Sequence, residues 1–159
     1  MAKFQKIIIL ENLPNAVSYV AHEIDKDGKD RYYYRHLDWQ EPYRNGINKD
    51  DEFFLIDRYQ VDEPGIVMHG FFDSDLTSYP LRWTNKRLYK IYLRDIQPVD
   101  PKKYRLLTIA SLQAAMPGQY WDLYKSGCFL NGPAVLKIRE MWKMYLEMND
   151  DFISNSDHS

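Results

Sequence analysis

Aromatic and amide side chains gather in parts of this sequence that carry no regular hydrophobic periodicity. Three of the four tryptophans, Trp39, Trp83 and Trp121, lie in such segments. A nucleic-acid base turned out of its helix needs flat apolar walls to stack on and hydrogen-bonding groups for its edge. We assign this base- or nucleotide-binding role to eight residues: Trp39, Tyr43, Arg44, Asn45, Ser74, Trp83, Trp121 and Ser126. The alternative, which is commoner for any single tryptophan, is that these rings close the ends of a barrel.

The charges are unevenly distributed along the chain. The net charge is −2, yet residues 11–63 carry 13 acids against 7 bases, and residues 76–110 carry 8 bases against 2 acids. A protein that coats long duplexes is usually basic overall, so this pattern favours one basic patch. Solvated charge on strand faces is the simpler explanation. We expect Arg82, Lys86 and Arg87 to hold phosphates of the backbone.

Catalytic and metal-binding patterns are sparse, and the sequence predicts no cofactor and no metal. The glycines are isolated, and no Gly-Lys-Ser/Thr phosphate loop occurs. The single cysteine, Cys128, excludes an intramolecular disulfide, and the four histidines lie far apart. Ser126-Gly127 lacks the surroundings of a nucleophile elbow.

The elements that position these residues are mostly short strands. A chain of 159 residues forms one domain, which we place at residues 1–149, with a polar tail at 150–159. Alternation and β-branched runs predict strands at residues 6–11, 52–56, 65–72 and 89–94, with a bulge or close backbone approach at Gly70. Such a succession indicates a small barrel.

The remaining segments are expected to be helices and loops. Residues 16–24 suit either a short helix or one arm of a hairpin that continues at Arg31, and we favour the helix or an irregular segment. Residues 37–48 should be largely loop, because they contain Pro42, Asn45 and Gly46. Helices are predicted at residues 108–115, capped by Thr108, and at 133–148, with a buried face that includes Trp142.

Several short motifs resemble one known family. They are residues 49–56 (KDDEFFLI), residues 64–75 (PGIVMHGFFDSD), Arg82-Trp83, residues 112–117, Trp121, Ser126-Gly127, Leu130, and the helix with Trp142. In this order they resemble the EVE-like group of the PUA-like superfamily, and residues 12–19 are similar to its N-terminal loop. The sequence departs from that pattern in Asp50, which replaces a glycine, and in Lys125, where some relatives carry histidine.

The resemblance implies an α+β fold, with a PUA-like mixed pseudo-barrel of about five or six strands and surrounding helices. It also implies a non-catalytic module that holds a flipped, modified base of DNA or RNA, with Trp39 and Trp83 as stacking walls. Any cutting would be done by a separate nuclease or modification partner.

Two alternatives stay open. The more distant ASCH group, some of whose members look like small amidohydrolases, implies an enzyme for a modified nucleoside in which a lysine, a threonine and a glutamate act. Lys86, Thr84 and Glu52 are of the right types, although they do not align with that group's motif. A protein-interaction module would instead use the acidic N-terminal half. No apolar run approaches the ~20 residues of a membrane span, so we expect a cytoplasmic protein without a membrane partner, and its oligomeric state is open.

Overall fold

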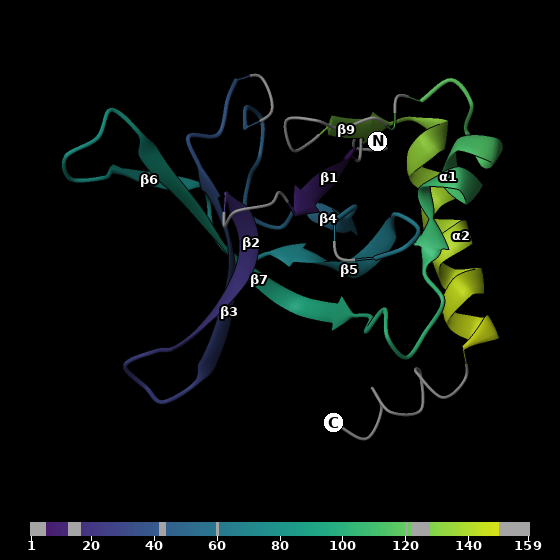
Figure 1. Cartoon of the computed structure of the whole chain (residues 1–159), viewed down its shortest axis with the longest axis horizontal. Coiled ribbons are helices and arrows are strands. Elements are labelled where there is room, and N and C mark those ends of the chain that lie inside the picture. Colours follow the sequence, from purple (N-terminus) through teal and green to yellow (C-terminus); the bar gives the residue numbers. More distant parts are fainter. Residues whose placement is uncertain are drawn as a thin grey trace, which may run out of the picture.

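The computed structural model of this chain describes residues 6–12, 17–41, 44–59, 61–119, 121 and 128–149. These residues form an α+β structure in which one mixed sheet carries two helices on one side (Figure 1). The segment 12–19, which resembles an N-terminal loop, lies partly outside the described residues, and the tail at 150–159 lies wholly outside them.

The described part of the chain contains nine strands, more than the five or six expected. They are β1 (Lys6–Asn12), β2 (Ser18–Ile24), β3 (Asp30–Leu37), β4 (Glu52–Asp57), β5 (Gly65–Phe72), β6 (Thr77–Pro80), β7 (Arg87–Pro98), β8 (Leu107–Thr108) and β9 (Cys128–Asn131). The order in the sheet is β2-β3-β7-β5-β4-β1-β9, with β6 paired to β7 and β8 paired to β5. All pairs are antiparallel except β1 with β4.

The expectation of a helix or irregular segment at 16–24 is wrong. Residues 18–24 form β2, which pairs with β3 from Ser18↔His36 to Ile24↔Asp30. The hairpin arises because the Asp25 side chain accepts hydrogen bonds from the backbone N–H groups of Asp27 and Lys29, at 2.9 Å each, and so fixes the turn. The four strands predicted at residues 6–11, 52–56, 65–72 and 89–94 are confirmed as β1, β4, β5 and part of β7.

The bulge predicted at Gly70 is also confirmed. Phe71 lies opposite Arg94 and His69 opposite Gln97, so two residues of β7 face Gly70 alone. A Cβ at Gly70 would come within 3.0 Å of both Phe53 and Ile96, which explains the need for glycine. The bulge bends β7, so that its first half pairs with β3 and β6 and its second half with β5.

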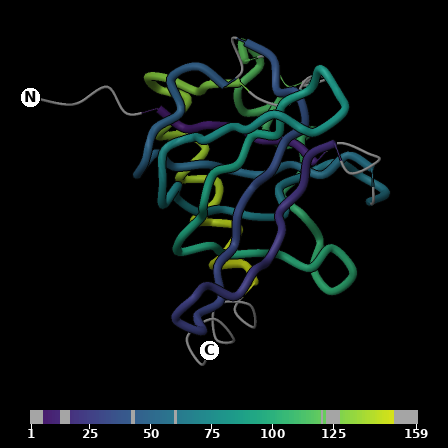
Figure 2. The backbone as a smooth tube through the Cα atoms, turned by 90° about the vertical axis from the view of Figure 1, so that its left-hand side faces the viewer, coloured from purple at the N-terminus to yellow at the C-terminus, as the bar shows by residue number. Residues whose placement is uncertain are grey.

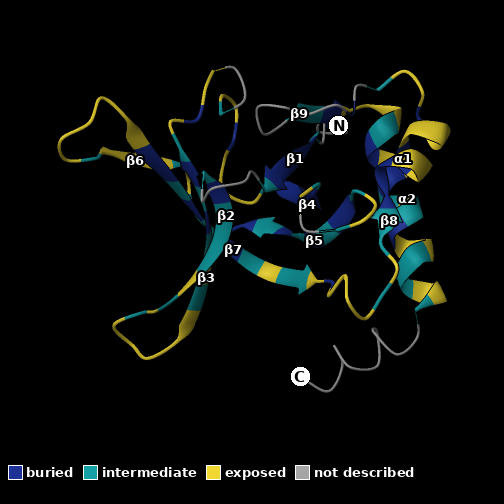
Figure 3. Cartoon of the chain, in the orientation of Figure 1, coloured by how far each residue is buried: buried dark blue, intermediate teal, exposed yellow. Residues whose placement is uncertain are grey.

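The core has two parts, one on each face of the central strands. Alternate residues of β1 and β4, such as Ile9 and Phe54, pack against the helices, whereas Ile8 and Phe53 pack within the curved sheet on the other side. Figure 3 accordingly shows β4 as buried. The Ser18 hydroxyl donates to the Glu11 carbonyl at 2.6 Å. This hydrogen bond connects β2 with β1, although the two strands are not paired in the sheet.

Both predicted helices are present. α1 (Ile109–Ala115) begins after Thr108, whose hydroxyl accepts the backbone N–H of Ser111 at 3.1 Å, as the capping prediction requires. α2 (Pro133–Met148) starts with proline in its first turn and buries Val135, Ile138 and Trp142. The predicted apolar face of this helix is therefore core.

Candidate nucleic-acid interface

The segment that presents the predicted basic residues is a two-stranded ribbon, here defined as residues 77–90. β6 pairs with β7 from Thr77↔Lys90 to Pro80↔Arg87. The turn is closed by the Leu81 N–H, which donates to the Lys86 carbonyl at 3.1 Å. The Thr84 hydroxyl donates to the Leu81 carbonyl and accepts the N–H of Lys86, at 3.1 Å each, so the turn is held internally. Figure 1 shows this ribbon projecting from the body on the side away from the helices.

Trp83 lies at the tip of the ribbon and is fully exposed, with 100% relative accessibility. Its φ of 66° is in the left-handed region, which costs a non-glycine residue roughly 1–2 kcal/mol. Neither burial nor backbone preference therefore explains tryptophan at this position. An outlying backbone conformation at an exposed aromatic residue is grounds for a functional hypothesis.

Three cationic residues lie near Trp83 in the sequence, in the turn and at the start of β7. Arg82 and Lys86 are exposed, and no described residue forms an ion pair with either of them. Arg87 is fixed across the ribbon, where its Nε and Nη2 donate to the Ser78 hydroxyl at 3.2 and 3.1 Å. No acidic residue occurs between positions 76 and 94, so the ribbon has a uniformly positive charge.

The loop at 38–47 supplies a fourth cation at the base of the ribbon. The Arg44 guanidinium lies 4.9 Å from the centre of the Tyr89 ring, and Tyr89 is paired with Ser78. Since Arg87 bonds Ser78 and side chains at paired positions lie on one face, Arg44 and Arg87 share that face of the ribbon. Arg44 is held there because it also donates to the carbonyl of Trp39.

The structure does not bring the predicted tryptophan walls together. Trp39 is 1% exposed and packs inside the curved sheet, stacked on His36. Trp121 is 3% exposed and belongs to the other core cluster, beside the helices. Both rings are therefore core, and the prediction that they line an open cleft with Trp83 is wrong.

Ser74 also differs from its predicted role. Its hydroxyl donates to the Asp75 carbonyl and accepts the N–H of Tyr92, at 3.0 Å each, which stabilises the turn between β5 and β6. Asn45 is exposed in the loop at 38–47. Tyr43 and Ser126 lie outside the described residues.

The three residues of the amidohydrolase alternative are not assembled. Thr84 and Lys86 lie in the ribbon turn, whereas the Glu52 carboxylate is 8% exposed at the start of β4 and faces α2. Arg139 donates to Glu52 from Nε and Nη2 at 2.9 and 2.7 Å, and His69 Nε2 lies 2.8 Å from it. Burial would raise the pKa of Glu52, but these hydrogen bonds and the cationic partner outweigh burial, so the pKa is lowered. Glu52 is an anchor between sheet and helix.

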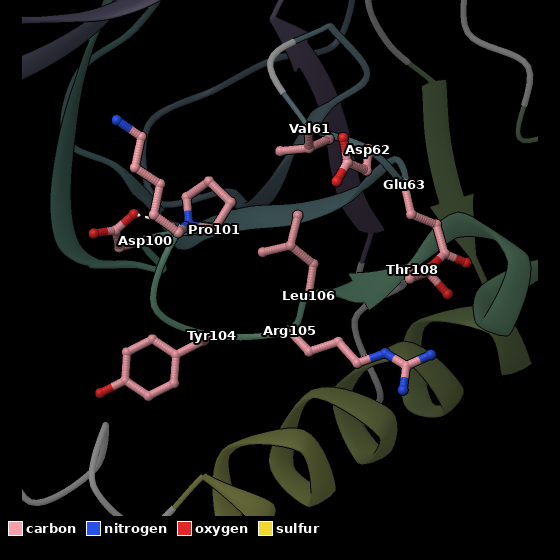
Figure 4. A pocket seen from close by; sticks show the side chains of 10 residues that line it. Val61, Asp62, Glu63, Asp100, Pro101, Tyr104, Arg105, Leu106 and Thr108 are labelled. Atoms are coloured by element: carbon pink, nitrogen blue, oxygen red, sulfur yellow. Dashed lines mark hydrogen bonds between the residues drawn. The ribbon is translucent and has the colours of Figure 1, made fainter.

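Sequence reasoning missed a pocket of about 800 Å³ beside the segments that follow β4 and β7 (Figure 4). Its lining comes from residues 61–63, which follow β4, and from the stretch 100–108, which follows β7, and none of the predicted site residues is among them. Its walls combine three acids, Asp62, Glu63 and Asp100, with Lys102, Arg105 and the Tyr104 ring. The mixture of charges gives the pocket no single ligand preference, and its residues occur in two separate segments that no sequence pattern links.

Comparisons with protein-family models, with curated proteins and with solved structures found no match for this chain. Of the helices that the structure describes, none has the length and apolar character to cross a membrane. Within the same residues, no three histidine, cysteine, aspartate or glutamate side chains gather as a metal site does.

Proposed function

We propose that this chain is a non-catalytic nucleic-acid-binding module of the cytoplasm, with the PUA-like pseudo-barrel that its EVE-like motifs suggest, and that it inserts Trp83 into the base stack of DNA or RNA. The observation that carries the proposal is the combination, at one residue, of complete exposure, a strained backbone and cationic neighbours. Folding gains nothing from that combination, whereas a base offers Trp83 a flat partner.

The ribbon has the dimensions and charge for this task. A two-stranded ribbon fits the major groove of duplex DNA, and apolar side chains that enter between base steps partly unstack them. Arg82 and Lys86, which are exposed, would follow the phosphates, and Arg87, which is hydrogen-bonded to Ser78, would set the register.

The same geometry supports a preference for a modified base. Turning a base out of the duplex costs a few kcal/mol, and least where pairing is already weak. An inserted Trp83 ring replaces the stacking that the neighbouring bases lose. A base whose modification weakens its pairing is therefore extruded at lower cost than its unmodified counterpart.

Fluorescence anisotropy with matched oligonucleotides tests the proposal. We would titrate a duplex with and without one modified base against the wild type and Trp83→Asn, since asparagine tolerates the left-handed backbone. We expect the variant to bind ~1–3 kcal/mol more weakly. Tyr59→Ala removes an aromatic ring that is 49% exposed outside the ribbon and serves as the matched control. Equal affinity of wild type and Trp83→Asn for every duplex would end the proposal.

A further inference from the structure

The outer face of β2, β3 and β7 carries alternating tyrosines and cations, of which Lys90 alone belongs to the ribbon. We call Tyr19, Tyr33, Tyr92, Arg31, Arg35 and Lys90 the tyrosine-cation face. In β3 the residues Tyr34 and His36 point into the core, so Arg31, Tyr33 and Arg35 point outward. Figure 2 looks onto this side of the molecule, where α2 lies behind the strands.

The cations of this face lie over tyrosine rings. The Arg31 guanidinium is 3.6 Å from the centre of the Tyr92 ring, and Arg35 is 4.8 Å from that of Tyr19. The Lys90 ammonium is 4.2 Å from the centre of Tyr33. These cation–π contacts hold the cations against the sheet, and because the rings are neutral they do not cancel the positive charge.

The positive charge of this face is only partly balanced. Glu23 is the carboxylate that contacts it, accepting from the Tyr92 hydroxyl at 2.6 Å and from Lys90 at 3.5 Å. The hydrogen bond from Tyr92 and the charge of Lys90 lower the pKa of Glu23, so it is ionised at neutral pH. Three cations against one carboxylate leave two positive charges, which an anionic partner would neutralise.

The face is continuous with the ribbon. Lys90 is paired on one side with Thr77 of β6 and on the other with Arg35 of β3, and Tyr33 is paired with Tyr92. Lys90 therefore joins the tyrosine-cation face to the base of the ribbon, on the face of β7 opposite to Arg87 and Tyr89.

We infer that this face binds single-stranded nucleic acid that continues from the ribbon-bound site, an inference that rests on the proposed function. Unpaired bases expose both faces and stack on tyrosine rings and on arginine planes, and their phosphates match the unbalanced cations. A duplex offers this flat face only its phosphates. The ligand class is therefore a duplex with a single-stranded extension, or a strand opened by the ribbon.

The test compares a blunt duplex with the same duplex carrying an extension of about six nucleotides, within the roughly 4–16 nucleotides that single-strand-binding surfaces cover. We expect wild type to bind the extended form about tenfold tighter, from stacking of one or two bases. The double variant Arg31→Gln/Arg35→Gln should lose this gain and keep its affinity for the blunt duplex. Tyr33→Leu, which keeps every charge, should lose part of the gain.

Lys26→Gln/Lys29→Gln provides the matched control, because it removes the same charge from exposed positions of the same hairpin. If this control loses the gain equally, or if poly-glutamate displaces the extension as well as an oligonucleotide does, the face is a general anion surface and the inference is overturned. Blunt-duplex binding that depends on Trp83 but shows no gain from the extension overturns the inference alone. Absence of any Trp83-dependent binding overturns the proposed function with it.

Discussion

The imidazole of His36 is stacked on the indole of Trp39, with ring centroids 5.1 Å apart and planes 9° from parallel. His36 is 5% exposed, and its Nδ1 donates to the Leu37 carbonyl at 2.9 Å. This pair closes one end of the curved sheet beneath the loop that carries Arg44. It also buries the imidazole of His36, and burial makes the protonated form of that ring unfavourable.

We expect the stability of the protein to fall as the pH drops from about 6.5 to about 4 because of His36. Burial lowers the pKa of His36 from 6.5 to about 4, and the Leu37 carbonyl and Asp38 offset this only in part. Between these pH values the unfolded state is protonated at His36 and the folded state is not. The contribution of His36 to the free energy of unfolding therefore decreases by about 3 kcal/mol as the pH falls over that range.

Urea unfolding of the wild type and His36→Asn between pH 4 and pH 7 measures this effect, since asparagine keeps a donor for the Leu37 carbonyl. The variant should show a smaller loss of stability over this range. Parallel pH profiles for the two proteins would contradict the assignment.

Trp83→Asn should leave the protein as stable as the wild type, or more stable by about 1 kcal/mol, because asparagine adopts the left-handed backbone at lower cost. For a chain of this length that corresponds to a rise in Tm of about 2–4 °C. Thermal unfolding followed by circular dichroism measures it. A large decrease in Tm would mean that Trp83 supports the fold, and the case for a ligand-binding role would fail.

The salt dependence of binding should report on the cations of the ribbon. Each phosphate contact contributes about −0.9 to the slope of log affinity against log salt concentration for a duplex. Replacing Arg82 or Lys86 with Gln should therefore make the slope less steep by about one unit. Lys26→Gln, in another hairpin, should leave it unchanged, and an equal change there would argue against a specific phosphate path.

Removing Arg139 should weaken the attachment of α2 to the sheet. Arg139→Met removes the cationic partner of the buried Glu52 carboxylate, at an expected cost of about 1–3 kcal/mol after allowing for the partial exposure of Arg139. The pKa of Glu52 is lowered below its usual 4.5, so the stability it contributes is present above that pH and is lost as the pH falls. A double-mutant cycle with Glu52→Gln at pH 7 should show coupling of the two sites, which should shrink in acid.

Gly65→Ala should destabilise the protein by about 1–3 kcal/mol, because the new Cβ would lie 2.7 Å from the backbone oxygen of Leu107 and would push β8 from β5. Gly118→Ala is the control, since nothing lies within 4 Å of its Cβ position. Similar unfolding free energies for the two variants would show that the close approach of β5 and β8 is not maintained.

Much of the fold could be predicted where burial leaves a periodic pattern. Three elements could be predicted in this way: β1 from the buried run at residues 7–10, β7 from its alternation, and α2 from its apolar face. β6 left no such pattern, because all four of its residues are exposed and its pairing with β7 buries no face. β2 was mistaken for a helix or loop because only its first residue is fully buried.

The site could be predicted only in part. The sequence indicates the basic residues at 82, 86 and 87 and the aromatic residue beside them as candidates. It does not predict that they share one two-stranded ribbon. Trp39 was assigned to an open wall since a loop position suggests exposure, yet the loop folds back and the indole pairs with His36. Only long-range packing determines which loop residues return to the core, and a local pattern does not contain it.

The placement of β1 between β4 and β9 constrains how the protein is made. Ile7 lies opposite Glu52 on one side and Leu130 on the other. During synthesis on the ribosome, β1 can pair with β4 as soon as residues 52–57 have emerged. The other edge of β1 stays unpaired until β9, which ends at Asn131, has emerged. Incomplete chains would thus expose an aliphatic strand edge, and chaperones would be the expected safeguard against its aggregation.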